Sequence, residues 1–62
     1  MPIIHVNLIE GRPAEKVAKL IENITEVTVE TLDAPRESVR VIVNEIPGSH
    51  WGIAGKPMSK EK

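Results

Sequence analysis

Few side chains in this 62-residue sequence are suited to chemistry, and the most unusual candidate lies at its start. Pro2 directly follows Met1, so removal of Met1 would convert the proline ring nitrogen into a secondary amine. A neutral amine of this kind is a general base. The pKa of an α-amino group is about 8, and a proline amine is more basic, so its surroundings would have to lower that pKa.

Two arginines and a tryptophan are suited to lowering the pKa of that amine. Positive charge on Arg12 and Arg40 disfavours protonation of a nearby amine, and so does an apolar pocket lined by Trp51, the single aromatic residue. The same guanidinium groups could bind substrate carboxylates and stabilise negative charge developing on an oxygen. With Pro2, these residues predict proton transfer next to a carbonyl group, with no metal and no cofactor. Taken singly, each has a structural alternative: Arg40 as an exposed strand residue, Arg12 as a turn residue and Trp51 as a packing residue.

Other chemistries lack the residues that they need. The sequence has no Cys, and its two histidines, His5 and His50, lie far apart without a zinc-ligand pattern or a nucleophilic triad signature. The glycines that precede Lys56 fit neither a P-loop nor a dinucleotide-binding fingerprint. A net charge of −1 argues against nucleic-acid and membrane-surface partners. Without an apolar run of membrane-spanning length or a signal peptide, we expect a cytoplasmic protein.

Three segments should position the candidate residues. A β-branched stretch over 3–9 predicts a strand with Ile4, Val6 and Leu8 on one face. After Glu10-Gly11-Arg12-Pro13, apolar residues recur at helical spacing, and Pro35 should end this helix near residue 32 or 33. A second strand is expected over 38–46. The predicted apolar side of the helix comprises Val17, Leu20, Ile21, Ile24, Val27, Thr28 and Thr31.

A strand, a helix and a strand form a βαβ unit with parallel strands, and this unit is too small to stand alone. Both sheet edges and one sheet face would remain open, and neither a disulfide nor a metal stabilises the chain. We therefore expect two subunits to pair into a four-stranded sheet, and such dimers to assemble further. The Gly-rich tail, 49–58, predicts a hairpin or an arm that reaches a partner, and 60–62 should fray.

Five short motifs in register resemble the 4-oxalocrotonate tautomerase (2-hydroxymuconate tautomerase) family of the tautomerase superfamily, over essentially the whole chain. They are the initiating Met-Pro, L-I-E-G-R at 8–12, L-D-A-P at 32–35, S-V-R-V at 38–41 and G-S-H-W-G-I-A-G at 48–55. The resemblance implies a single α/β domain over 1–62, a βαβ subunit with a C-terminal hairpin, assembled as a homohexameric trimer of dimers. It also implies that Met1 is removed.

The resemblance further implies an isomerase that converts a dienol dicarboxylate such as 2-hydroxymuconate to its conjugated 2-oxo acid. Pro2 would be the general base and acid. Arg40 would bind the C2 oxygen and the near carboxylate, and Arg12 the distal carboxylate, with the arginines contributed by different subunits. The backbone amide of Ile9 corresponds to a position that helps to orient an ordered water. Trp51 stands where family members often carry Phe, which keeps the pocket apolar and narrows it.

Two alternatives stay open beside the isomerase. Relatives that hydrate or dehalogenate unsaturated three-carbon acids need an additional carboxylate in the tail and an extra arginine near the first strand. Ile53 and Ile9 occupy those positions here, which favours proton transfer over water addition. The second alternative is a hexameric binding protein without catalysis, for which replacement of Pro2 would change nothing.

Overall fold

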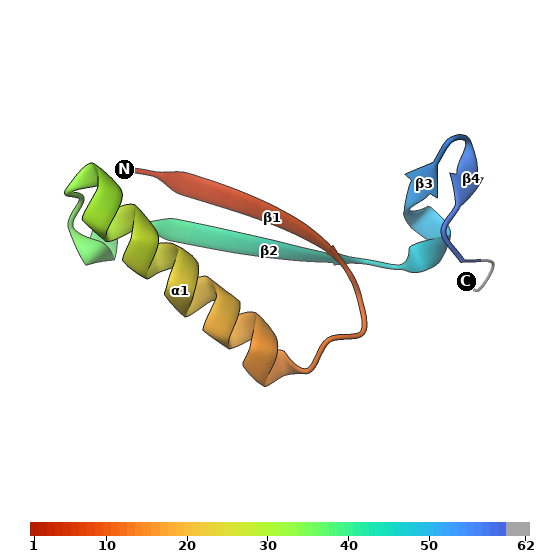
Figure 1. Ribbon diagram of the computed structural model, residues 1–62, viewed down its shortest axis with the longest axis horizontal. Helices are drawn as coiled ribbons and strands as arrows, with labels where there is room; N and C mark the ends of the chain where they lie inside the picture. The colour runs from red at the N-terminus through yellow and green to blue at the C-terminus, as the bar shows by residue number, and fades with distance from the viewer. Residues whose placement is uncertain (60–62) are drawn as a thin grey trace.

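The computed structural model describes residues 1–59, and its strands and helix follow one another in the order predicted from the sequence (Figure 1). The second strand begins at Arg40 and not at the expected residue 38, because residues 36–38 form a 3-10 turn that the sequence pattern did not predict. The expectation for 60–62 lies outside the described residues. The elements are β1 (Ile3–Ile9), α1 (Ala14–Leu32), the 3-10 turn η1 (Arg36–Ser38), β2 (Arg40–Ile46), the 3-10 turn η2 (Gly48–His50), β3 (Gly52–Ile53) and β4 (Lys56–Pro57). The βαβ unit and the C-terminal hairpin are therefore both confirmed.

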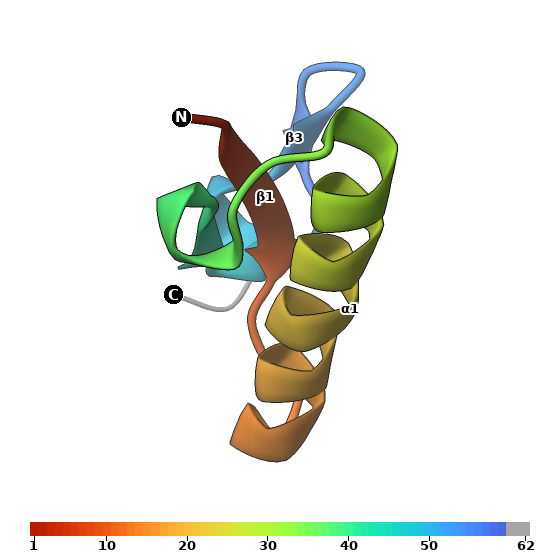
Figure 2. The same cartoon turned by 90° about the vertical axis from the view of Figure 1, so that its left-hand side faces the viewer.

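β1 and β2 pair in parallel over their full lengths, from Ile3 opposite Arg40 to Ile9 opposite Ile46. Burial alternates along β1. Ile4, Val6 and Leu8 are half-buried on one face, whereas Ile3, His5 and Asn7 are exposed on the other. This is the alternation expected of a sheet that is covered on one side only. α1 lies along the covered side (Figure 2), so the predicted orientation of the first strand is confirmed.

The helix begins directly after Pro13, whose φ of −62° suits the residue that precedes a helix. It ends at Leu32, because Asp33 adopts the left-handed conformation (φ 55°, ψ 38°) and Pro35 follows. The expected end of the helix is thus confirmed. Thr25 and Thr28 donate their hydroxyls to the carbonyl oxygens four residues earlier, both at 2.8 Å, which satisfies these hydroxyls within the helix.

The covered side of α1 differs from the predicted one at its edge. Val27 is 61% exposed and Thr31 is exposed as well, whereas Thr25 and Val29 are half-buried. A residue three positions after another lies about 60° around the helix from it, so Val27 falls beside the stripe that faces the sheet. The single chain therefore leaves part of the expected apolar side in contact with solvent.

The single chain has no buried core. No residue in the described range 1–59 is buried, and several large apolar side chains are exposed, among them Ile3, Ile42, Ile53 and Met58. The accessible surface is 4803 Å², whereas a compact monomer of this mass would expose about 4,000 Å². The radius of gyration is 14.5 Å, against about 11 Å for a compact domain of this length.

The hairpin of β3 and β4 accounts for much of this extended shape. It lies beyond the carboxyl end of β2, away from α1, so that the molecule measures 43 × 24 × 13 Å (Figure 1). β3 and β4 pair with each other and with no other strand in the part of the chain that the structure describes. Across residues 1–59, the structure contains no helix with the length and apolar character needed to span a bilayer.

Candidate active site

Pro2 and Arg40 lie together at the amino ends of the two parallel strands. The backbone N–H of Arg40 donates to the carbonyl oxygen of Pro2 at 3.0 Å, which extends the β1–β2 pairing by one bond. Arg40 also faces Ile3 across the sheet, with an exposed side chain on the face opposite α1. The parallel register thus places the backbones of Pro2 and Arg40 side by side within a single chain.

A bond to the preceding turn holds the Arg40 guanidinium. Its Nη1 donates to the carbonyl oxygen of Glu37, in η1, at 2.6 Å. Hydrogen bonds donated by a charged group are among the stronger ones in proteins, so this bond favours one arrangement of the side chain. The remaining guanidinium donors are available to an anion.

Met1 precedes Pro2 in the structure and is 80% exposed, while Pro2 itself is half-buried. With Met1 in place, the Pro2 nitrogen belongs to a peptide bond and carries no proton to exchange. Chemistry at this nitrogen would therefore require the removal of Met1.

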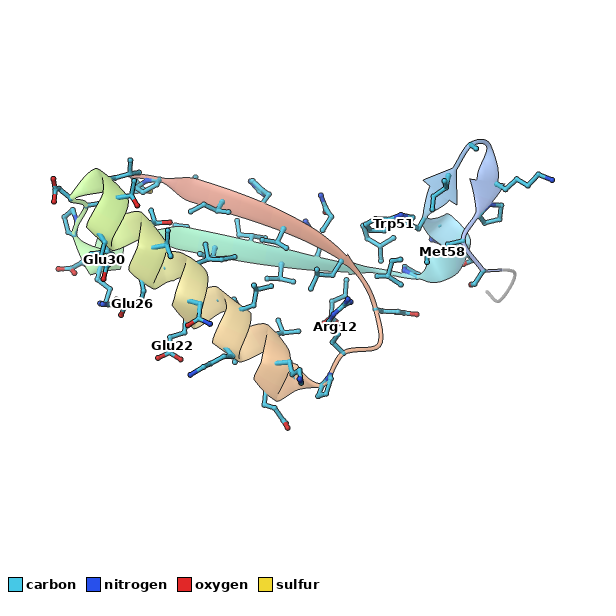
Figure 3. The ribbon with its side chains drawn as sticks, in the orientation of Figure 1. Arg12, Glu22, Glu26, Glu30, Trp51 and Met58 are labelled. Carbon is cyan, nitrogen blue, oxygen red and sulfur yellow. The ribbon has the colours of Figure 1, made fainter. Side chains whose placement is uncertain are left out.

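Arg12 and Trp51 lie at the opposite, carboxyl ends of the strands (Figure 3). Arg12 follows β1 after Gly11, which has a φ of 126°, and its Nη1 donates to the carbonyl oxygen of Ile9 at 3.1 Å. Trp51 follows η2 and is half-buried. Its backbone N–H donates to the carbonyl oxygen of Gly48 at 3.2 Å, and its own carbonyl oxygen accepts the backbone N–H of Met58 at 2.8 Å. The turn and the hairpin therefore fix the tryptophan backbone on both sides.

The five candidate residues form two groups that one subunit does not unite. Pro2 and Arg40 lie at one end of the sheet, and Ile9, Arg12 and Trp51 at the other. The six residue steps from Ile3 to Ile9 span about 20 Å at the rise of a parallel strand. No small substrate bridges this length, so a site that uses both groups needs a second copy of the chain to bring the missing group near.

One contact between α1 and η1 is absent from the sequence-based prediction. Glu26, expected on the solvated side of α1, accepts a hydrogen bond from Nη2 of Arg36 at 2.5 Å, which ties η1 to the helix. The two residues are ten positions apart, and their contact depends on how the chain turns after Leu32. Helical periodicity does not extend across that turn, so the sequence pattern carried no signal for this pair.

Glu22, Glu26 and Glu30 follow one another along α1 (Figure 3). Lys19 Nζ lies 3.9 Å from Glu22 Oε1, and both side chains are well exposed. Within residues 1–59, no three His, Cys, Asp or Glu side chains come together as a potential set of metal ligands.

The sequence matches the family model described as Tautomerase enzyme over residues 2–61. It is 58% identical to a probable tautomerase of Ralstonia nicotianae over 62 residues, which covers all of this chain and 89% of that protein. It is 47% identical to a 2-hydroxymuconate tautomerase of a Pseudomonas species (strain CF600) over 60 residues, which covers 97% and 95% of the two chains.

Solved structures with the same fold include a 4-oxalocrotonate tautomerase homologue of the tomaymycin biosynthetic pathway. It superposes with a TM-score of 0.89 at 46% identity, covering 92% of this chain and 88% of the other. A heterohexamer 4-oxalocrotonate tautomerase from Chloroflexus aurantiacus gives a TM-score of 0.90 at 29% identity, with both chains covered completely. The resemblance seen in the sequence motifs is thus confirmed over the whole chain.

Proposed function

This chain belongs to the tautomerase family, and we propose that it is a cofactor-independent isomerase of a dienol dicarboxylate such as 2-hydroxymuconate. The similarity to 2-hydroxymuconate tautomerases over nearly the full length of both chains supports this substrate class. The observation that carries the proposal is the parallel register, which holds Pro2 beside Arg40 through the 3.0 Å bond from Arg40 N to Pro2 O.

In the proposed reaction, the Pro2 amine freed by loss of Met1 accepts a proton from the dienol. It then returns the proton to a carbon farther along the conjugated chain. The product is the conjugated 2-oxo acid, so atoms and electrons balance without an oxidant or a second substrate. Pro2 acts first as general base and then as general acid.

The arginines support this proton transfer through charge. Arg40 binds the near carboxylate and the oxygen at C2, whose negative charge grows in the transition state. Arg12 binds the distal carboxylate, which fixes the substrate along the pocket. Trp51 provides the apolar wall that keeps the amine largely unprotonated, because burial disfavours its charged form. The amide of Ile9 orients a water at the pocket edge.

We assign these groups to different subunits of a homohexamer built as a trimer of dimers. The two groups lie at opposite ends of a strand about 20 Å long, so the complete pocket forms where one subunit's amino-terminal end meets another subunit's carboxyl end. The absence of a buried core within residues 1–59 supports obligate assembly. The Chloroflexus aurantiacus relative is a heterohexamer, which supports six chains in the assembly.

The decisive experiment compares Met-processed protein with Pro2→Ala in the ketonisation of 2-hydroxymuconate, followed by ultraviolet absorbance. Mass spectrometry first verifies the loss of Met1. We expect turnover to fall by about 10²- to 10⁴-fold in the variant, the contribution typical of a general base. Equal, near-background rates would refute the isomerase, and faster turnover of a haloacrylate than of the dienol would favour the hydratase or dehalogenase alternative.

A further inference from the structure

The turn between α1 and β2 determines where the Arg40 guanidinium lies. Arg40 Nη1 donates to the carbonyl oxygen of Glu37, the central residue of η1, at 2.6 Å. The backbone N–H of Arg40 is held separately by Pro2. The backbone position of Arg40 therefore depends on the sheet, whereas the position of its guanidinium depends on η1.

η1 is a stiff unit. Pro35, which precedes it, has a φ of −62° fixed by its ring. The carbonyl oxygen of Pro35 accepts both the N–H of Ser38, at 3.0 Å, and the Ser38 hydroxyl, at 2.8 Å. The Val39 N–H donates to Arg36 at 3.2 Å. A displacement of one end of η1 would therefore move the Glu37 carbonyl as well.

An ion pair anchors η1 to the helix. Arg36 Nη2 lies 2.5 Å from Glu26 Oε2, and the two side chains are 56% and 46% exposed. In the region that the structure describes, this contact is the one side-chain hydrogen bond between η1 and α1. Figure 2 shows the turn, in green, beside the amino-terminal start of β1 and joined to the end of α1 by the residues between them.

We propose that the Glu26–Arg36 ion pair is a positioning element for Arg40. It fixes η1 against α1, and η1 in turn directs the guanidinium through the Glu37 carbonyl. The inference rests on the proposed function, in which Arg40 stabilises charge on the C2 oxygen. Glu26 and Arg36 do not contact substrate in this scheme.

The pair should matter more for catalysis than for stability. A half-exposed ion pair stabilises a fold only slightly because water screens it. Transition-state stabilisation, by contrast, requires donors placed close to their ideal positions, and a small displacement of a donor lowers the rate. Arg40 is proposed to bind both the near carboxylate and the C2 oxygen, whose charge grows in the transition state. Its displacement should therefore lower kcat more than it raises KM.

The test uses the processed, assembled protein and the variants Arg36→Gln, Glu26→Gln and Arg36→Lys. The first two should each lower kcat by about two- to fivefold. The double variant should be no slower than either single variant, because both changes remove the same contact. Arg36→Lys, which keeps the charge, should recover part of the loss. Lys19→Gln removes an ion pair elsewhere on α1 and is the matched control, with unchanged kcat.

NMR spectroscopy reports the position of the Arg40 guanidinium independently of catalysis. In ¹⁵N-labelled protein, the Nε–H resonance of Arg40 is assigned by its disappearance in Arg40→Lys. It should shift in Arg36→Gln and Glu26→Gln and stay in place in Lys19→Gln. If the wild type lacked tautomerase activity, the proposed function would fail, and this resonance would still test the positioning role.

Two results would overturn the inference. One is an unchanged Arg40 resonance in both Arg36→Gln and Glu26→Gln. The other is a loss of kcat that Lys19→Gln shares to the same extent, because a general weakening of the helix surface would then explain both.

Discussion

At the scale of residues, the two arginines are held in ways that suit different tasks. Arg40 belongs to a strand and is bonded through both its backbone and its side chain, whereas Arg12 lies in a loop with one bond to Ile9. We predict that Arg12→Ala raises KM for a dicarboxylate by about 10- to 100-fold with little change in kcat, because hydrogen bonds between charged groups are lost equally in ground and transition states. Steady-state kinetics on 2-hydroxymuconate measures both constants.

The matched measurement for Arg12→Ala uses a monoacid such as phenylenolpyruvate, which has no distal carboxylate. Its KM should be unaffected by the substitution. An equal rise in KM for both substrates would show that Arg12 serves the pocket in another way, for example by shaping the loop through its bond to the Ile9 carbonyl.

At the scale of elements, the C-terminal hairpin turns through two residues with positive φ, Ala54 at 52° and Gly55 at 86°. A two-residue turn of this kind favours Asn or Gly at its first position, and alanine there carries a steric cost. We predict that Ala54→Asn stabilises the protein by about 0.5–1 kcal/mol. The readout is the thermal midpoint at a fixed protein concentration, which should rise.

As a control for Ala54→Asn, the same replacement of alanine by asparagine is made in the helix. Ala18 is exposed in α1, where Asn is a poorer helix former, so Ala18→Asn should lower stability by about half a kcal/mol. Ala54→Val should also lower the midpoint, because β-branched residues tolerate positive φ poorly. A lower midpoint for Ala54→Asn would mean that the hairpin adopts another turn in the assembled protein.

At the level of the whole molecule, the single chain exposes apolar surface that a stable fold would bury. Ile42 is 43% exposed on the open face of the sheet, opposite His5 in the register, and no residue within 1–59 is buried. We predict that Ile42→Glu shifts the protein to smaller species and lowers activity in parallel, since a charge buried at an interface is costly. Sedimentation velocity and the tautomerase assay, run at the same concentrations, follow the two effects.

Asn23→Glu adds the same charge on an exposed position of α1 and serves as the comparison. It should leave both assembly and activity unchanged. If Ile42→Glu stayed fully assembled, the open face of the sheet would not be a subunit interface. If it dissociated with full activity, the pocket would be complete within one subunit, contrary to the separation of its two groups.

Local sequence patterns were sufficient to predict most of the elements and their faces. Strand alternation in 3–9, helical spacing after Pro13 and the stop before Pro35 are local signals, and each was found where it was expected. The motifs around Pro2, Arg12, Arg40 and Trp51 were equally readable, because residue type and order carry them. Two boundaries were predicted wrongly. The second strand begins at Arg40 and not at residue 38. At the edge of the helix stripe, small differences in rotation about the helix axis decide whether Val27 faces the sheet.

Which candidate residues lie together depends on contacts between elements, which no local pattern predicts. The parallel register put Pro2 beside Arg40 and left Arg12 and Trp51 at the far end of the strands. The turn after α1 joined Glu26 to Arg36 and the Glu37 carbonyl to the Arg40 guanidinium. These contacts link residues that no local pattern relates, because they depend on how a turn directs the chain across a helix end. The periodicity of apolar residues in the sequence indicates the face of an element on which a side chain lies. The packing of the elements against one another determines which residue that side chain contacts.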